Sequence, residues 1–275
     1  MTTETKTTDT HDTKAPAVHV TLAMFDSREP IYRPAREGVP IGRFTPLGLD
    51  DYAPSGTTPL RDAVARFIAH LDGLRAADRV TIGLLLDESG SMGGNREAVI
   101  AGVNEFVAGM RDVDAVDPAS AGSVLAVIVT DGFENSSREV DPRTLAKAIA
   151  DHERDGWTFI YLGANQDAWA VGEQTGFSGT ASGQAVNFPA SREGTRAAMA
   201  SVAGDAREYL RDRRTYAETR AASPRRSITE DGDEVLSNLG ASPGTPGDPR
   251  SASRRGSPYA DVNDAIKQAK QATRR

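Results

Sequence analysis

Hydrophobic residues along this chain follow two distinct patterns. Continuous apolar runs occupy residues 80–86, 124–129 and 157–162, and runs of this kind, rich in Val, Ile and Leu, predict strands buried on both faces. Residues 60–75 and 95–110 instead carry apolar side chains at helical spacing, which predicts amphipathic helices. The alternation of buried strands with amphipathic helices predicts an α/β domain with an open, mostly parallel sheet.

Two weaker strand signals precede this set. Residues 18–25 alternate loosely between apolar and polar positions, which is typical of a strand. Residues 31–44 contain a second strand, which Pro34, Gly38 and Pro40 interrupt. Because proline cannot donate a hydrogen bond to a sheet, we expect this second strand at an edge, as the outer half of a hairpin.

Shorter patterns complete the predicted domain. Asp141 and Pro142 predict the start of a helix, with the Asp as its N-cap. A short helix is expected from Asp167, and a last short strand over residues 185–188. Residues 191–218 are rich in Ala and predict a long helix.

The two ends of the chain differ in composition from this domain. Residues 1–17 are polar and rich in Thr, and residues 222–258 are rich in Ser, Pro, Gly, Arg and Asp. Both compositions are typical of disordered segments. Residues 259–275 predict at most a short helix, which would be marginal alone in water. We therefore place one domain at residues 18–221 and a mostly disordered tail after it, from residue 222 to residue 275.

The amino-acid composition excludes several kinds of site and partner. The 275 residues include no cysteine, which excludes disulfides, zinc–thiolate sites and thiol nucleophiles. The formal net charge of −7 opposes general attraction to nucleic acid or to an anionic membrane. No apolar run approaches the roughly 20 residues of a membrane span, and the first residues do not form a secretory signal. We expect a cytoplasmic protein without nucleic-acid or membrane partners.

Candidate ligands for a metal ion follow two of the buried strands. Asp87 comes directly after residues 80–86, with Ser89 and Ser91 close behind, and Asp131 follows the next buried strand. Neighbouring parallel strands lie about 4.8 Å apart, so both carboxylates are expected in one crevice at the carboxyl edge of the sheet. Oxygen donors of these types suit a hard divalent cation such as Mg²⁺, or Mn²⁺.

A third hydroxyl, that of Thr58, falls at the same predicted edge, and each of these residues also has a simpler explanation. Ser89 and Ser91 are suited to capping the helix that follows them. Thr58 precedes Pro59 and is suited to capping the next helix. Asp131 begins an ordinary turn sequence. The coincidence of three segments at one sheet edge is what favours a shared metal site.

The same residues carry a resemblance. Residues 87–91 read Asp-x-Ser-x-Ser, residues 58–60 read Thr-Pro-Leu, and residues 130–132 read Thr-Asp-Gly. This combination resembles the metal-ion-dependent adhesion site of von Willebrand factor A domains. Within that superfamily, three further segments are similar to a group of small bacterial proteins built around the domain. These segments are residues 104–106, 134–139 and 156–165.

The resemblance implies a Rossmann-like fold with helices on both faces of the sheet and a metal site with defined roles. It implies that Ser89, Ser91 and Thr58 bind the ion directly or nearly so, and that Asp87 and Asp131 act partly through water. It also implies a free coordination position for an acidic side chain of a partner protein. That agrees with the tendency of Mg²⁺ to keep exchangeable waters.

The order of segments departs from that family. In the family the Asp-x-Ser-x-Ser strand comes first, whereas here the hairpin and Thr58 precede Asp87. If the sheet order is kept, right-handed crossovers put every intervening helix on one face, although the buried strands need cover on both. We expect the long connector at residues 111–123 to let the helix at residues 95–110 reach the far face by a left-handed route. The alternative is cover from the helix at residues 191–218 with help from a second subunit.

Three functions remain open at this point. We predict a metal-dependent protein-interaction module with no catalytic residues. A metal-assisted hydrolase or phosphoryl-transfer enzyme is compatible with carboxylates and Mg²⁺, but the chain has neither a phosphate-binding Gly-rich loop nor a nucleophile elbow. The third possible function is that of a scaffold protein. In that case the metal site would be vestigial, and the locally basic tail near residues 251–257 would bind the partner. Glu88 has no assigned role and is interpreted as a solvated charge at the rim.

Overall fold

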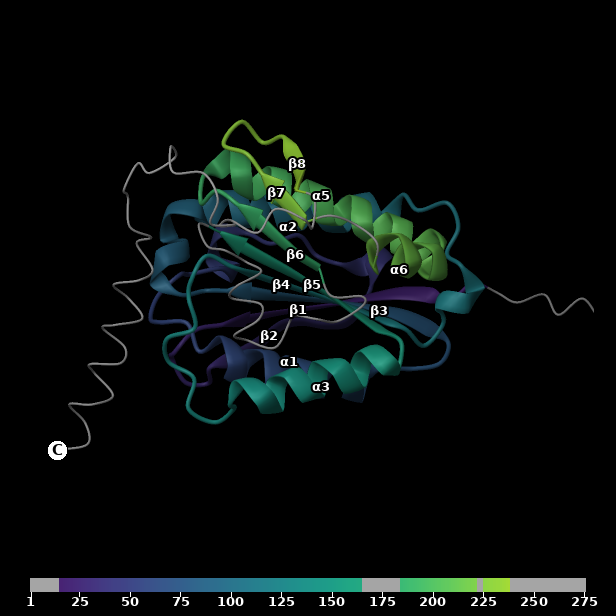
Figure 1. Cartoon of the computed structure of the whole chain (residues 1–275), viewed down its shortest axis with the longest axis horizontal. Coiled ribbons are helices and arrows are strands. Elements are labelled where there is room, and N and C mark those ends of the chain that lie inside the picture. The colour runs from purple at the N-terminus through teal and green to yellow at the C-terminus, as the bar shows by residue number, and fades with distance from the viewer. Residues whose placement is uncertain (1–14, 165–183, 222–224, 238–275) are drawn as a thin grey trace, which may run out of the picture. The chain divides into compact units, whose positions relative to one another are not determined.

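The computed structural model describes residues 15–164, 184–221 and 225–237. It shows an eight-stranded, mostly parallel sheet in the order β2-β1-β3-β4-β5-β6-β7-β8, with helices on both faces (Figure 1). The strands are β1 (Ala17–Phe25), β2 (Tyr32–Pro40), β3 (Arg79–Asp87), β4 (Val124–Thr130), β5 (Trp157–Ala164), β6 (Gln184–Phe188), β7 (Arg225–Ile228) and β8 (Glu234–Ser237). The α-helices are α1 (Leu60–Leu74), α2 (Arg96–Arg111), α3 (Pro142–Arg154), α5 (Arg192–Arg211) and α6 (Arg213–Ala221). The open α/β fold expected from the sequence is therefore confirmed.

The centre of the sheet is formed by the strands with continuous apolar runs. Every residue of β4 and β5 is buried, and so is nearly every residue of β3. β1 and β3 are parallel, as are β3 and β4, and their registers pair Phe25 with Asp87 and Leu86 with Val129. β2 is the antiparallel edge strand predicted from its prolines. These registers bring the carboxyl ends of β3 and β4 to one edge.

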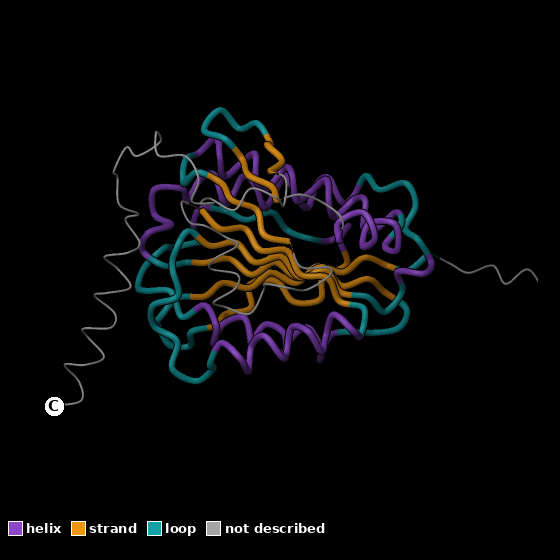
Figure 2. Tube along the Cα trace, viewed as in Figure 1, coloured by secondary structure: helices purple, strands orange, loops and turns teal. Residues whose placement is uncertain are grey.

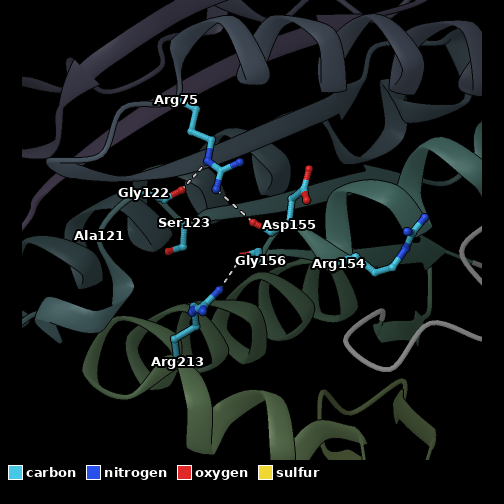
Figure 3. Close-up of a pocket in the computed structure, with 8 residues that line it drawn as sticks. All are labelled: Arg75, Ala121, Gly122, Ser123, Arg154, Asp155, Gly156 and Arg213. Atoms are coloured by element: carbon cyan, nitrogen blue, oxygen red, sulfur yellow. Dashed lines mark hydrogen bonds between the residues drawn. The ribbon is translucent and has the colours of Figure 1, made fainter.

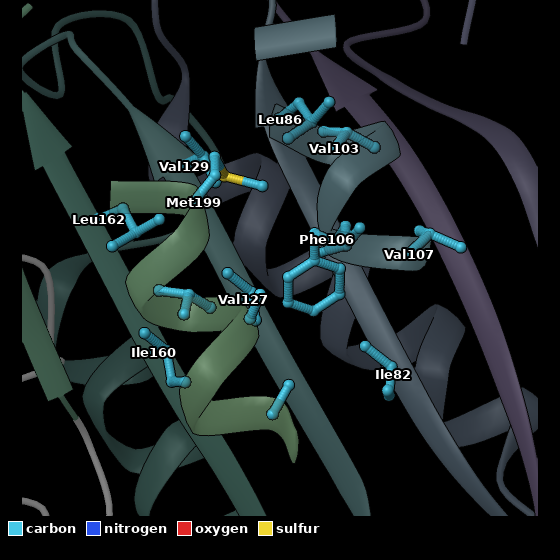
Figure 4. Close-up of a cluster of buried hydrophobic side chains, with 14 of the residues drawn as sticks. Ile82, Leu86, Val103, Phe106, Val107, Val127, Val129, Ile160, Leu162 and Met199 are labelled. Atoms are coloured by element: carbon cyan, nitrogen blue, oxygen red, sulfur yellow. The ribbon is translucent and has the colours of Figure 1, made fainter. Parts of the chain in front are cut away.

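Two layers of helices enclose the sheet, as Figure 2 shows. On one face, α1 and α3 bury Phe67 and Ile149 against residues such as Phe159 of β5. On the other face, α2 and α5 pack against each other and against the sheet, and α6 adds Tyr216 to the same core. Figure 4 shows part of this second core, with Phe106 of α2 in the same cluster as residues of β3, β4 and α5.

The crossover through α2 has the opposite hand to its neighbours. β1, β3, β4 and β5 are parallel and follow one another across the sheet in chain order. The steps from β1 to β3 and from β4 to β5 carry α1 and α3 on one face, whereas the step from β3 to β4 carries α2 on the other. The step from β6 to β7, which carries α5 and α6 on the α2 face, has the same hand as the α2 crossover. Since roughly 98% of such crossovers are right-handed, this mixture of hands is a rare feature of the fold. α1 and α2 thus lie on opposite faces, as expected, and no second subunit is needed to cover the α2 face.

The structure corrects the predicted elements near the end of the domain. The segment expected to be a linker from residue 222 contributes β7 and β8, which form an antiparallel hairpin and extend the sheet. The predicted helix over residues 191–218 is two helices, α5 and α6, separated at Asp212. The helix expected from Asp167, the tail after residue 237 and most of residues 1–17 lie outside the described residues. None of the helices in the described ranges has the length and apolar character that crossing a membrane requires.

Close packing of α2 on α5 depends on a glycine. A Cβ atom at Gly102 of α2 would lie 2.7 Å from Cγ of Met199 and 2.9 Å from its Cβ. In contrast, a Cβ at Gly204 of α5 would meet no atom within 4 Å. These two glycines therefore form a matched pair in adjacent helices.

We expect opposite effects from alanine at these two sites. Gly204→Ala should raise the free energy of unfolding by about 0.5–1 kcal/mol, because alanine is the better helix former. Gly102→Ala should lower it by about 1–3 kcal/mol, because the methyl group overpacks the contact with Met199. Urea unfolding followed by circular dichroism measures both. Equal stabilisation by the two variants would contradict this packing of α2 on α5.

Candidate metal centre

Asp87 and Asp131 lie at the carboxyl ends of β3 and β4. Asp87 is the last residue of β3 and is fully buried, while Asp131 directly follows β4 and is half-buried. The Thr130 hydroxyl donates a hydrogen bond to Oδ2 of Asp87 at 2.5 Å, and the Ser89 amide donates to Oδ1 at 2.7 Å. The Tyr52 hydroxyl donates to the Asp87 carbonyl. The Asp87 carboxylate is therefore held in a fixed orientation by both neighbouring segments.

The two serines join Asp131 in a chain of hydroxyl contacts. Ser89 Oγ and Ser91 Oγ are 3.0 Å apart, and the Ser91 hydroxyl donates to Oδ1 of Asp131 at 2.6 Å. A short 3₁₀ turn (Gly90–Asn95) follows Ser89, and neither it nor α2 receives a hydrogen bond from the side chain at its N-cap. The alternative explanation of Ser89 as a helix cap is thus contradicted.

Thr58 is brought to the same place by the turn after β4. Its side chain is buried, its amide donates to Oδ1 of Asn135 at 3.0 Å, and its carbonyl accepts from the Asn135 amide at 3.3 Å. A Cβ atom at Gly132 would lie 2.5 Å from the Thr58 hydroxyl oxygen, so Thr58 lies directly against the residue that follows Asp131. The N-cap of α1 is Pro59 rather than Thr58, and α1 has no side-chain cap. The capping explanation of Thr58 is therefore wrong.

A further loop ties this side of the site to the serine turn. The Gly90 amide donates to the Gly56 carbonyl at 3.1 Å, and the Ser55 amide donates to the Glu88 carbonyl at 2.7 Å. Gly56 has a φ of +74°, and a Cβ there would be 2.7 Å from the Ser27 hydroxyl oxygen. Glycine at position 56 is therefore what permits this approach of the loop, which leads into Thr58.

The carboxyl groups of Asp87 and Asp131 are wholly or partly removed from water, without a positively charged side chain from the described part of the chain paired to either of them. Burial raises the pKa of Asp87 to about 6, against hydrogen bonds from Thr130 and Ser89 that favour the ionised form. Burial also raises the pKa of Asp131. No Arg, Lys or His is among the main causes of either shift, and no basic side chain of the described residues forms an ion pair with Asp87 or Asp131. A bound cation would supply the missing positive charge.

Glu88 does not fit its interpretation as a solvated rim charge. Its side chain is buried, and its Oε1 accepts a hydrogen bond from the Ala53 amide at 2.5 Å. It pairs with Arg33, and Arg28 Nη2 lies 3.4 Å from its Oε2. The same two arginines pair with buried Asp26. Burial raises the pKa of Asp26, but hydrogen bonds from Arg28 and Arg33 outweigh this and leave it lowered. Glu88 therefore belongs to an ion-pair network that supports the loop behind the site.

Several supporting residues were not identified from the sequence. Asn135 holds Thr58, and Glu134 accepts the amides of Ser136 and Ser137. Asp62 of α1 accepts amides of residues 138–140. The segment at residues 134–139 carried only the family resemblance, and no spacing rule marks Asp62, which looks like an ordinary first-turn acid of a helix.

The described residues contain no group of three or more His, Cys, Asp or Glu side chains suited to a metal. The candidate centre is of a different type, two carboxylates with three hydroxyls, and all five predicted residues lie in segments that the structure brings together. Thr130 is an addition to them, since its hydroxyl contacts Asp87. Comparisons with family models, with curated proteins and with solved structures gave no match to this chain.

Proposed function

We propose that this protein is a metal-dependent protein-interaction module that binds an acidic side chain of a partner through Mg²⁺ or Mn²⁺. Asp87, Ser89, Ser91, Thr58 and Asp131 would hold the ion. When bound, the cation neutralises the two carboxylates and offers a coordination position to an incoming carboxylate.

The observation that carries the proposal is the pair of carboxylates with raised pKa values and no basic neighbour. Asp87 and Asp131 lie beside hydroxyl groups, and burial disfavours the charge of both. Buried carboxylates are normally paired with a cation or coordinate a metal. Elsewhere among the described residues the buried acids Asp26 and Asp205 have arginine partners, and the buried Asp62 instead accepts hydrogen bonds from three backbone amides. A metal ion at the edge of β3 and β4 would provide the balancing charge for two neighbouring acids that have no arginine partner in the described part of the chain.

The residues of the chain prepare this arrangement before any ion arrives. Hydrogen bonds from Thr130 and the Ser89 amide fix the Asp87 carboxylate, and the Ser91 hydroxyl orients Asp131. Hydroxyl oxygens are uncharged metal ligands, so a cation that they coordinate keeps more of its positive charge for a partner's carboxylate. Phe133 is exposed only two residues after Asp131, which adds apolar surface for a protein partner.

An enzyme is less well supported by the surroundings of the site. His19 Nδ1 contacts the Gly38 carbonyl, and His152 Nδ1 contacts the Ala148 carbonyl. His70, in the second half of α1, contacts Tyr32 and Glu37 of β2. These histidines of the described residues therefore have other partners. A general base next to Asp87 would be needed for hydrolysis.

Calorimetric titration with Mg²⁺ and with Mn²⁺ tests the metal site. Wild-type protein should bind one ion at neutral pH, and Asp131→Asn should weaken binding at least about tenfold, because it removes one of two charged ligands. Asp72→Asn removes the same charge from an exposed position on α1 and should leave the affinity unchanged. Equal metal binding by all three proteins would refute the proposal.

The interaction itself is tested by affinity capture with and without chelator. Proteins retained in Mg²⁺ should be released by EDTA and should not be retained by Asp131→Asn. Deleting residues 238–275 should leave this metal-dependent capture intact. Capture that follows the tail and ignores EDTA would instead favour a scaffold with a vestigial metal site.

A further inference from the structure

A surface cavity of about 280 Å³ lies where β4 and β5 begin, at the edge of the sheet opposite the candidate metal centre. Its walls come from the end of α1, the turns before β4 and β5, and the start of α6. Figure 3 shows Arg75 and Arg213 reaching toward it from opposite sides, with the backbone of the two turns between them. Arg154 lies at the side, with its guanidinium directed away.

Both converging guanidinium groups are held by backbone carbonyls. Arg75 donates from Nε to the Gly122 carbonyl at 2.6 Å and from Nη2 to the Asp155 carbonyl at 3.1 Å. Arg213 donates from Nη1 to the Gly156 carbonyl at 2.8 Å, and it also interacts with the buried Tyr209 hydroxyl. These contacts fix the direction of each fork but use only part of its N–H donors. Both arginines are thus oriented in advance.

Glycines in the left-handed region make room for this arrangement. Gly122 has a φ of +75° and Gly156 a φ of +90°. A Cβ atom at Gly156 would lie 2.7 Å from Nη1 of Arg213, so a larger residue would displace that guanidinium. The turns before β4 and β5 therefore supply the carbonyls that hold the two arginines without crowding the cavity between them.

The charge around the cavity is unbalanced. Arg154 is paired with Asp151, but neither Arg75 nor Arg213 forms an ion pair with a carboxylate among the described residues. By contrast, Arg33 and Arg226 in this chain each contact an aspartate. Asp155 is the one acid that lines the cavity. Two oriented guanidiniums against one carboxylate leave net positive charge facing a polar space.

We propose that this cavity binds the phosphate group of a small molecule. A tetrahedral phosphate has enough oxygens to accept hydrogen bonds from two guanidinium forks on opposite sides, whereas a carboxylate is filled by one fork. The volume is near the lower end of the range for small-ligand sites. The Arg75–Arg213 site is separate from the candidate metal centre. Phosphate binding at this site is therefore tested independently of the proposed function.

Titration calorimetry in EDTA with inorganic phosphate and with phenyl phosphate tests this site, at constant ionic strength set by chloride. Wild-type protein should show saturable binding in the millimolar range or below. Arg213→Gln should weaken it at least about tenfold, because a charged hydrogen-bond donor is lost. Asp155→Asn should strengthen it about fivefold, because a repelling charge near the anion is removed.

Arg143→Gln is the matched control. It removes the same charge from the same surface helix as Arg154, about 17 Å along α3 from the cavity, and it should leave phosphate binding unchanged. Tighter binding of phenyl phosphate would identify an organic phosphate as the ligand class, and equal binding would identify free phosphate. The absence of saturable binding, or binding that Arg213→Gln and Asp155→Asn both leave unchanged, would overturn the proposal.

Discussion

Replacing Asp87 with Asn is expected to stabilise the metal-free protein and to abolish its stabilisation by Mg²⁺. Burial raises the pKa of this carboxyl from 3.8 to about 6. The folded state therefore binds the proton more tightly than the unfolded state, and the free energy of unfolding falls as pH rises from about 4 to about 6. Above that range the full penalty of the buried charge, about 3 kcal/mol, applies to the metal-free wild type.

The neutral amide of Asn avoids the penalty of the buried charge, but it has one hydrogen-bond acceptor atom fewer than the carboxylate. Asp87 accepts from both Thr130 and the Ser89 amide, and losing one of these bonds costs about 1 kcal/mol. The net expectation for Asp87→Asn in EDTA at pH 7 is a gain of about 2 kcal/mol. At pH 4 the gain should vanish, because the wild-type carboxyl is then mostly protonated.

Mg²⁺ should reverse the order of the two proteins. At a metal concentration of about 100 times the dissociation constant, the wild type gains about 2.7 kcal/mol, whereas Asp87→Asn should gain little. Urea unfolding at pH 4 and pH 7, in EDTA and in Mg²⁺, measures all four conditions. Asp72→Asn, which removes an exposed charge, should change stability by less than about 0.5 kcal/mol throughout. Destabilisation by Asp87→Asn that is equal with and without metal would contradict this account of the site.

The second large effect is expected at Phe106, because it tests the position of α2. Phe106 is 1% exposed and belongs to the core between α2, α5 and the sheet, in one cluster with Ile82 of β3 and Val127 of β4 (Figure 4). Truncation to alanine leaves a cavity that this close-packed layer cannot fill. We expect Phe106→Ala to lower the free energy of unfolding by about 3–5 kcal/mol.

Phe133→Ala provides the matched control, since Phe133 is 46% exposed and should cost less than about 1 kcal/mol. Chemical unfolding followed by tryptophan fluorescence measures both variants. If the two substitutions cost the same, α2 does not cover β3 and β4 as described. Such a result would also remove the evidence that its crossover has the opposite hand to the α1 and α3 crossovers.

The residues of the candidate metal centre differ in how far they could be identified from the sequence. Asp87 and Asp131 were found because each follows a buried strand, and parallel strands that pair side by side end at a common edge. Ser89 and Ser91 were found through their spacing from Asp87. The buried role of Glu88 was missed, since an acid between two site residues gives no sign of the arginines that reach it from β2 and the preceding turn. Its partners are 55 residues away for Arg33, a separation that no local rule detects.

Sequence alone determined the fold class and the main helices and strands up to residue 164, because the periods of apolar residues differ between strands and helices and the strongly apolar runs have few alternative placements. Tertiary structure decided the face on which α2 packs, the addition of β7 and β8 to the sheet, and the contact of Thr58 with the turn after β4. It also decided the pairing of Arg75 with Arg213 across one cavity. These features depend on contacts between segments distant in the chain, whose energies come from packing and charge rather than from local propensity.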